Sequence, residues 1–401
     1  MIVVVGAGAA GLMAAIFAAS SNHRVVLLER TPDGGRKILI SGGGRCNVLP
    51  SVFAPERFVT DSPAHLMRGM LRSWSLVQQR AYFESDLHQP LTLEPDTGKL
   101  FPVSNRARDI RDALVEHARQ AGVSVQFDSR MTGLEVTSEG WRVQTDRGPV
   151  EAARVVLATG GVSVPTTGSD GGGLRLAEAL GHRVNELYPA LTPLVTEPPV
   201  HSALSGVSLP VRLRARRGRQ VTETRGGFLF THRGYSGPSV LDISHVAVRR
   251  QSNNERAIIK AQWTTLDVRA WEAVFSASNS LVVNAIAEHM PQRLGIHLMQ
   301  EAQVPLDRRA SDLRRAERLA LIDMLTAYEL PWTGDGGFAK AEVTGGGVDL
   351  REVNPQTLES RRHRGLFLCG EMLDAFGPIG GHNFAWAWAT GRLAGLGAAS
   401  T

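Results

Sequence analysis

Ile2-Val3-Val4-Val5-Gly6-Ala7-Gly8-Ala9-Ala10-Gly11 predicts a buried strand that turns through a G-x-G-x-x-G motif into a helix. In such a turn the first glycine permits a tight bend and the second lets the backbone approach a pyrophosphate. The third lets the helix pack close to the strand, and the helix N-terminus offers N–H groups to the phosphates. The segment therefore predicts a dinucleotide site formed by Gly6, Ala7, Gly8, Ala9, Ala10 and Gly11.

A second buried strand is predicted at Val25–Leu28, and it ends at the acidic Glu29. A carboxylate at this point of the motif can accept both hydroxyls of an adenosine ribose, and it would repel a 2′-phosphate. NADP is therefore not expected here, and the predicted site includes Glu29 and the adjacent Arg30.

The apolar residues 2–20 also admit interpretation as a signal peptide or a membrane span. No basic segment precedes them, and three glycines within the first eleven residues weaken a spanning helix. We expect no membrane segment and a cytoplasmic location.

Composition bounds the class of protein. The chain has 401 residues, 43% hydrophobic and 21% charged, which is long enough for two or three domains. Its two cysteines, Cys46 and Cys369, are far apart, so a disulfide scaffold and a C-x-x-C redox site are both excluded. The sequence contains no zinc-ligand cluster, and no metal site is predicted.

The net charge of +5 leaves a nucleic-acid partner open as an alternative. The dense basic run Arg212–Arg219 alternates partly like an exposed strand, so a solvated face is the favoured interpretation. We expect a small-molecule substrate rather than a nucleic acid, and the sequence sets no oligomeric state.

The order of strand-like and helix-like segments along the chain predicts an α/β protein whose nucleotide-binding domain is interrupted by inserted segments. Glycine-rich strand ends occur near both termini, a proline-rich stretch marks a boundary at 188–199, and helical periodicity dominates from 279 to 330. The prediction is a Rossmann-type FAD-binding domain from residues 1–190 and 340–401. It is interrupted by a β-barrel-like unit at 191–255, with 330–340 as a candidate completion, and by a helical insert at 256–330.

Several motifs together resemble the bacterial aminoacetone-oxidase-like flavoproteins, a family that also contains bile-acid reductases and has the glutathione-reductase-like FAD fold. The most specific is Lys-Ile-Leu-Ile-Ser-Gly-Gly-Gly-Arg-Cys-Asn at 37–47, and the likeness spans essentially the whole chain. The other motifs are Gly6–Gly11, Ala158–Gly161, Phe230–Pro238, Val343–Val348, Thr357–Ser360 and Gly370–Asn383.

This resemblance implies bound FAD. It places Arg45, Cys46 and Asn47 near the ribityl chain and flavin edge, Asp374 on the ribitol or pyrophosphate, and the helix that starts at Gly380–Asn383 with its dipole toward the isoalloxazine. Beyond the first turn and its acid, the cofactor residues expected from it are Lys37, Ser41, Gly42, Gly44, Arg45, Cys46, Asn47, Met131, Ala158, Thr159, Gly160, Gly161, Gly370, Glu371, Asp374, Gly380, Gly381, His382 and Asn383.

The chain departs from the family pattern at His382, where tyrosine is usual, at Ala385, where glutamine is common, and at Leu358, which replaces methionine. Flavin carries out hydride transfer itself, so the protein need only position and tune it. His382 and His232 are nevertheless the candidate catalytic residues, and Glu371 is a further candidate for proton transfer.

We predict an FAD-dependent oxidoreductase acting on a small or medium organic substrate. No second G-x-G-x-x-G follows a strand, so NAD(P)H would act as a transient electron donor rather than a resident cofactor. Two alternatives stay open at this point: a flavin-dependent RNA-modifying enzyme and a non-catalytic flavin-binding redox sensor.

Overall fold

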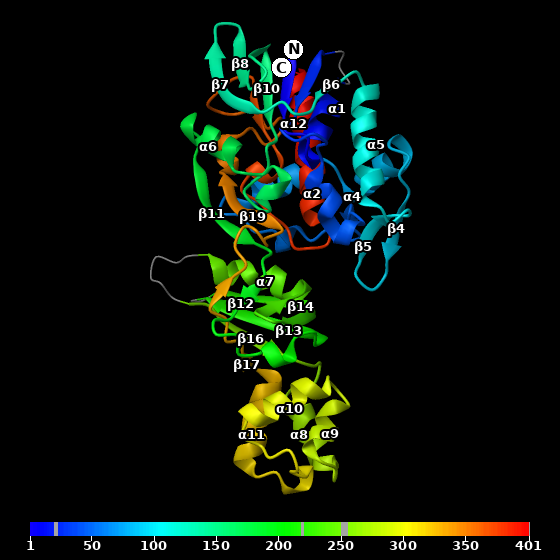
Figure 1. Ribbon diagram of the computed structural model, residues 1–401, viewed down its shortest axis with the longest axis vertical. Helices are drawn as coiled ribbons and strands as arrows, with labels where there is room; N and C mark the ends of the chain where they lie inside the picture. The colour runs from blue at the N-terminus through cyan, green and yellow to red at the C-terminus, as the bar shows by residue number, and fades with distance from the viewer. Residues whose placement is uncertain (20–22, 218–219, 250–255, 401) are drawn as a thin grey trace. The chain divides into compact units, whose positions relative to one another are not determined.

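The computed structural model describes residues 1–19, 23–217, 220–249 and 256–400, and the chain divides into two compact units (Figure 1). Met1–Tyr188 and Val343–Thr401 form the first unit, so the two ends of the chain share one core. Pro189–Glu342 form the second. The second unit begins at Pro189, the first proline of the proline-rich stretch, which lies within the strand Val184–Ala190.

A five-stranded parallel sheet forms the centre of the first unit. Val5 lies opposite Leu157 on one side and Leu28 on the other, so three neighbouring strands end at one level. Ligands of open α/β sheets bind at this carboxyl edge. The strand order is β20 (Leu366–Leu368), β10 (Arg154–Leu157), β1 (Ile2–Val5), β2 (Val25–Leu28) and β6 (Ser124–Gln126).

Two helices, α1 (Ala9–Ala19) and α12 (His382–Ser400), pack against each other in this unit (Figure 1). A Cβ on Gly391 would lie 2.3 Å from the Ala10 carbonyl oxygen, and one on Gly395 would lie 2.4 Å from that of Ala14. The glycines of α12 therefore allow the two backbones to touch, which fixes the start of α12 relative to the glycine turn before α1.

Small antiparallel sheets and further helices complete the first unit. The described residues contain no helix that is both long enough and apolar enough to cross a membrane. The sheets are β3–β5–β4 (Leu49–Pro50, Lys99–Pro102, Leu91–Glu94), β7–β8–β9 (Met131–Thr137, Gly140–Thr145, Val150–Ala152) and β11–β19 (Val184–Ala190, Val343–Val348). The helices are α2 (Arg36–Ile40), α3 (Ala64–Arg72), α4 (Leu76–Ala81), α5 (Ala107–Gln120) and α6 (Gly172–Ala179).

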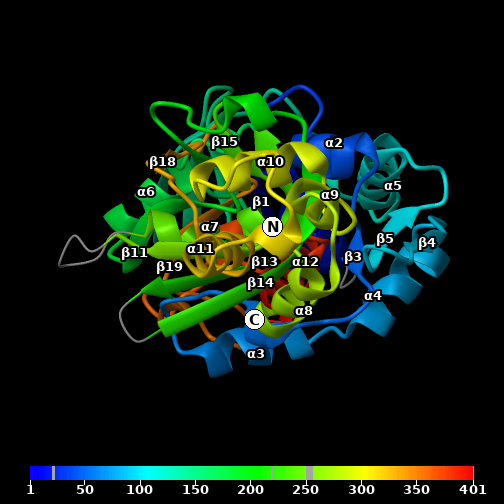
Figure 2. The same cartoon turned by 90° about the horizontal axis from the view of Figure 1, so that it is seen from below.

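The second unit has a seven-stranded antiparallel sheet, in which β13 and β14 are the long central pair (Figure 2). The sheet order is β17 (Tyr328–Glu329), β16 (Ile258–Gln262), β13 (Ser208–Arg217), β14 (Gln220–Thr231), β15 (Gly234–Ser236), β12 (Leu194–Val195) and β18 (Gly334–Asp335). Its helices are α7 (Pro238–Val248), α8 (Val268–Ala277), α9 (Val282–Ala287), α10 (Gln292–Glu301) and α11 (Arg315–Thr326).

The predicted helical insert at 256–330 needs a correction at both of its ends. Its first residues form β16, which pairs with β13, and its last form β17, which pairs with β16. Ile259 and Ala261 are buried between exposed neighbours, and this two-residue alternation is the pattern of a half-buried strand. The helices themselves occupy 268–326, and they share one hydrophobic core with the sheet.

Candidate functional site

The glycine turn after β1 uses its three glycines for two different purposes. Gly6 has a φ of 101°, and a Cβ there would lie 2.6 Å from the Ala158 carbonyl oxygen. A Cβ on Gly11 would lie 1.8 Å from the Gly6 carbonyl oxygen. A Cβ on Gly8 would meet no heavy atom within 4 Å apart from those of the adjacent residues. Gly6 and Gly11 are thus required by the protein's own packing, whereas Gly8 keeps open a space in front of the turn.

The first N–H groups of α1 border this turn. Leu12 N–H donates to the Gly8 carbonyl at 3.0 Å and closes the first helical turn. The amides of Ala9, Ala10 and Gly11 precede that bond and have no carbonyl partner within the helix. They form the N-terminal donor set that suits a phosphate.

Glu29 is buried beside the same turn, and its carboxylate contacts the chain's own donors. Oε2 accepts from Ala7 N–H at 2.7 Å, while Oε1 accepts from the N–H and the hydroxyl of Thr31 at 2.8 and 2.7 Å. A carboxylate has about four acceptor positions. Three are used in this way, so acceptance of both ribose hydroxyls would require one internal donor to be released. The adjacent Arg30 contacts Asp170.

The loop that follows α2 has an unusual backbone. Gly42, Gly43 and Gly44 have φ values of 55°, 68° and 85°, and Cys46 shares this left-handed region at 63°. Burial raises the pKa of the Cys46 thiol to about 12, against a lowering hydrogen bond from Ser41. Cys46 is therefore a packed, unreactive thiol.

Arg45 and Asn47 flank that cysteine and differ in their partners. Arg45 donates to Glu94 at 3.0 Å and lies 4.0 Å above the centre of the Phe101 ring. Asn47 is 8% exposed, and its Oδ1 has no hydrogen-bond partner among the described residues. A Cβ on Gly381 would lie 2.9 Å from this Oδ1. Asn47 therefore presents a free acceptor beside the start of α12.

The turn before α12 is stabilised by the side chain of Asn383. Gly380 and Gly381 have φ values of 99° and 91°. The side chain of Asn383 accepts from Gly377 N–H at 2.9 Å and donates to the Gly377 carbonyl at 3.0 Å. Asn383 thus stabilises the turn itself, and its predicted contact with a cofactor stays a prediction.

His382 begins α12 and is 6% exposed. Its Nδ1 lies 3.3 Å from the Ile379 carbonyl, so that nitrogen carries the proton, and Nε2 has no hydrogen-bond partner among the described residues. The rings of Phe53 and Phe58 lie 6.1 Å from the imidazole. Burial lowers the pKa of His382 to about 4. Near pH 7 His382 is therefore uncharged and offers Nε2 as an acceptor, and its catalytic role stays a prediction.

The structure places His232, the other candidate catalytic residue, in the second unit. It is exposed in the two-residue turn between β14 and β15. The glycine turn and His382 belong to the first unit. A catalytic role for His232 stays a prediction.

Lys37 and Glu371 form an ion pair that the sequence did not predict. Lys37 Nζ lies 2.7 Å from Glu371 Oε2 and 2.7 Å from Ser163 Oγ. Glu371 Oε1 also accepts from Ser163 Oγ at 2.7 Å and from Thr344 N–H at 2.9 Å. Burial acts to raise the pKa of Glu371, but the charge of Lys37 and these hydrogen bonds hold it below its usual value. Glu371 is therefore a fixed carboxylate rather than a proton carrier.

Ser163 and Thr344 were not among the predicted site residues, although Thr344 lies within the motif Val343–Val348. Thr344 Oγ1 accepts from the N–H groups of Val162 and Ser163 at 2.8 and 3.1 Å. Thr344 directly precedes Gly345–Gly347, and Ser163 follows Gly160–Gly161 after one intervening residue. A polar residue close to such a glycine run is the signal that would have identified them.

Asp374 is almost fully buried and joins separate segments of the first unit. Its Oδ2 accepts from Asp61 N–H, Ser62 N–H and Asn185 Nδ2 at 2.9, 2.9 and 2.7 Å. Burial raises the pKa of Asp374 above its usual value. The observed role is therefore structural, and its predicted bond to ribitol or pyrophosphate stays a prediction.

The other predicted cofactor residues are distributed along the same edge and its surroundings. The turn Ala158–Gly161 follows β10, and Gly370 follows β20 with its N–H donating to Thr390 Oγ1 at 3.0 Å. Met131 begins β7 and is partly buried, and the Ser41 hydroxyl donates to the Ile38 carbonyl at 2.7 Å.

The residues at this edge fit a flavin dinucleotide on structural grounds. The open space at Gly8 and the α1 N-terminus suit a pyrophosphate. The unpartnered acceptors Asn47 Oδ1 and His382 Nε2 are buried polar atoms that a ligand would satisfy. FAD, when bound, supplies hydride transfer.

These features define a class: a Rossmann-type FAD-binding domain of mixed α/β structure, with a parallel sheet and additional antiparallel sheets, as occurs in FAD-dependent oxidoreductases. The predicted fold class is thereby confirmed. The chain belongs to the HI0933-like family, since residues 1–397 match the model described as the HI0933-like protein Rossmann domain.

Similar proteins cover nearly the whole chain. A ribosomal RNA dihydrouridine synthase of Escherichia coli (strain K12) is 32% identical over 97% of this chain and 95% of its own length. A 3-dehydro-bile acid delta(4,6)-reductase of Clostridium scindens is 31% identical over 99% and 98%. A solved quinol fumarate reductase chain of E. coli is 15% identical, with a TM-score of 0.51 over 99% of this chain and 69% of its own, and it shows the fold alone.

Proposed function

We propose that this protein is an FAD-dependent reductase that saturates a carbon–carbon double bond conjugated to a carbonyl group. The observation that carries the proposal is the open space at Gly8, which leaves room for the pyrophosphate of a dinucleotide. The chemistry of a flavin dinucleotide is hydride transfer. The names of the two relatives support the reaction type. Dihydrouridine is uridine with one ring double bond reduced, and a 3-dehydro-bile acid delta(4,6)-reductase reduces ring double bonds of its substrate.

The net reaction takes one hydride from NADH or NADPH and one proton from solvent, and adds them to the two carbons of the double bond. Glu29 and the α1 N-terminus hold the dinucleotide. The neutral His382 Nε2 accepts a hydrogen bond from the cofactor or substrate without exchanging a proton. Lys37 keeps Glu371 ionised and fixed.

Anaerobic titration of the purified holoprotein with NADH and with NADPH tests this function. We expect one of the two to bleach the flavin absorbance, and an enone or a uridine-containing oligonucleotide to restore it through repeated cycles. Bleaching by neither nucleotide would contradict the proposal and favour a substrate-reduced oxidase. Bleaching without multiple turnover on any acceptor would favour a redox sensor. Oxygen is admitted at the end as a control, to show that the reduced flavin can be reoxidised.

RNA is the favoured substrate class for this reductase because one sheet face of the second unit is basic. Arg212, Arg214 and Arg216 alternate along β13 with the buried Val211, Leu213 and Ala215. Arg225 of β14 and Lys260 of β16 lie opposite Arg212 and Arg214 in register. Glu223 offsets part of this charge, because it pairs with Arg212 at 2.6 Å. Residues 218–219 of the predicted basic run lie outside the described residues.

Salt-dependent binding of a uridine-rich RNA tests that assignment. Removing two phosphate contacts with Arg214→Ala and Lys260→Ala should lower the slope of log affinity against log salt by about 1.4 to 1.8. Fluorescence anisotropy at four salt concentrations measures the slope, and Arg119→Ala, at an exposed position of α5, is the matched control. An unchanged slope in the double variant would exclude this face as the RNA contact and leave a small organic substrate.

A further inference from the structure

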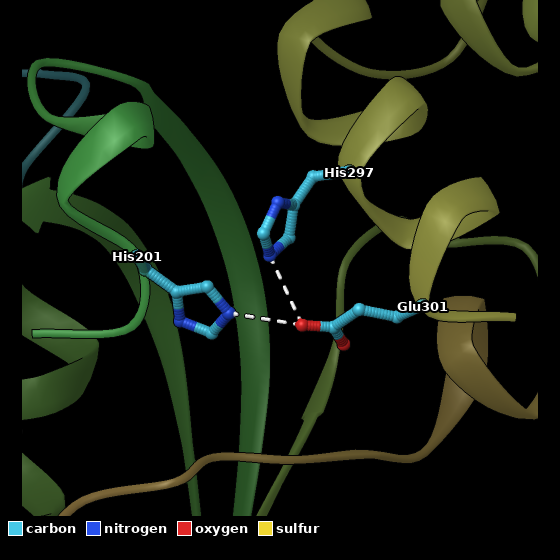
Figure 3. A group of neighbouring side chains, drawn as sticks. All are labelled: His201, His297 and Glu301. Atoms are coloured by element: carbon cyan, nitrogen blue, oxygen red, sulfur yellow. Dashed lines mark hydrogen bonds and ion pairs between the residues drawn. The ribbon is translucent and has the colours of Figure 1, made fainter.

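Two histidines and a glutamate converge in the second unit, to which none of the predicted cofactor residues belongs (Figure 3). His201 precedes β13, and His297 and Glu301 lie on α10. Their ligand atoms all lie within 4.8 Å of one another. We call these three residues the His–Glu cluster. It does not depend on the proposed reductase activity.

The geometry of the cluster resembles that of ligands around one ion. Glu301 Oε1 lies 3.0 Å from His297 Nε2 and 3.5 Å from His201 Nε2 (Figure 3). Ligands about 2.1 Å from a tetrahedral zinc ion are about 3.4 Å apart. His297 and Glu301 are four residues apart on one helix, so both side chains project from the same face. A small rotation of His201 or His297 suffices to bring three ligands around one point.

The cluster also leaves a ligand atom unsatisfied. His297 Nε2 is buried and makes no hydrogen bond among the described residues, although Glu301 Oε1 is close to it. His201 Nδ1 lies 2.7 Å from the Tyr235 hydroxyl. His201 Nε2 lies 3.0 Å from the Tyr328 hydroxyl and 3.5 Å from Glu301 Oε1. If Nδ1 donates its proton to Tyr235, the Nε2 lone pair faces that hydroxyl and Glu301, and a bound cation would replace the contact with the hydroxyl.

Two tyrosines supply the outer contacts that metal ligands usually have. Tyr235 orients the His201 ring through Nδ1, and the Tyr328 hydroxyl lies 3.2 Å from Glu301 Oε1 and 3.0 Å from His201 Nε2. Such outer hydrogen bonds fix the tautomer and direction of a metal-binding imidazole or carboxylate. Tyr235 and Tyr328 are themselves buried.

We propose that His201, His297 and Glu301 bind one divalent cation of the zinc type, with a fourth position left for water or another ligand. Two neutral imidazoles and one carboxylate are the donor set of several open zinc sites. The cation is held by one atom of each side chain and connects α10 to the segment before β13. The sequence did not predict this site because His201 and Glu301 are 100 residues apart.

Zinc uptake by the full chain tests the site. Protein stripped with a chelator, equilibrated with equimolar zinc chloride and passed through a desalting column should retain close to one zinc per chain by plasma mass spectrometry. His297→Ala and Glu301→Ala should each retain less than a tenth as much. His289→Ala is the matched control, because His289 is exposed in the turn between α9 and α10 and lies outside the cluster, and it should bind as the wild type does.

Zinc K-edge absorption of the wild-type protein keeps the test independent of variant folding. Two imidazole nitrogens and one carboxylate oxygen at about 2.0–2.2 Å would support the site. Wild-type protein that retains no more zinc than His297→Ala overturns the proposal, and so does a spectrum with sulfur ligands or without imidazole.

Discussion

Gly8→Ala is expected to weaken FAD binding at least 100-fold, which corresponds to about 2.7 kcal/mol, while leaving the folding of the protein almost unchanged. The added methyl group meets no atom of the chain within 4 Å, because it points into the space in front of the turn. A pyrophosphate that approaches the backbone there would collide with it. Titration of the apoprotein with FAD, followed by flavin fluorescence, measures the change in affinity.

Two other glycine variants bracket this result. Gly69→Ala, in α3, also adds a methyl group that contacts nothing, and it should retain wild-type affinity for FAD. Gly11→Ala should lose FAD and stability together, because its Cβ would lie 1.8 Å from the Gly6 carbonyl oxygen. Wild-type affinity in Gly8→Ala would show that the dinucleotide does not lie against this turn.

The glycine turn was predictable from sequence because its constraints are local. Three glycines, a preceding apolar strand and an acid at the end of the next strand fall within the first 29 residues. The structure confirms the strand, turn and helix at Ile2–Val5 and Ala9–Ala19. It also assigns a local function to Glu29 that the pattern did not indicate, namely binding the amide of Ala7.

Sites assembled from distant residues were not predictable in the same way. Lys37 and Glu371 are 334 residues apart, and only the pairing of β1, β10 and β20 brings their segments to one edge. No periodicity carries that information. The strand β16 was missed for a different reason: its five residues precede the helical periodicity of 279–330 but were included in the predicted insert.

Lys37→Met is expected to destabilise the first unit by about 2 kcal/mol, because it leaves the Glu371 carboxylate without its cation. Breaking a buried ion pair costs about 3 to 5 kcal/mol, and the 26% and 18% exposure of these side chains reduces the effect. For a unit of this size the thermal midpoint should fall by about 4 to 8 °C. Differential scanning calorimetry of the apoprotein measures it, with the exposed Lys340→Met as control.

The double variant Lys37→Met/Glu371→Gln separates charge from packing. Removing both charges should restore most of the decrease in thermal midpoint, because the destabilisation of Lys37→Met comes from an uncompensated carboxylate. Recovery of none of it would show that the lysine stem or its bond to Ser163, rather than the ion pair, stabilises the unit.

The pH dependence of this pair has a definite sign. The folded state lowers the pKa of Glu371 from its usual 4.5, so the unfolded chain binds the proton more readily. The stabilisation from Glu371 is therefore fully present above pH 4.5 and is lost as the pH falls through the lower pKa of the folded state. The difference in midpoint between wild type and Lys37→Met should consequently be constant from pH 6 to 8 and shrink toward pH 4. A difference that grows on acidification would contradict the assignment of Glu371 as a carboxylate held by Lys37.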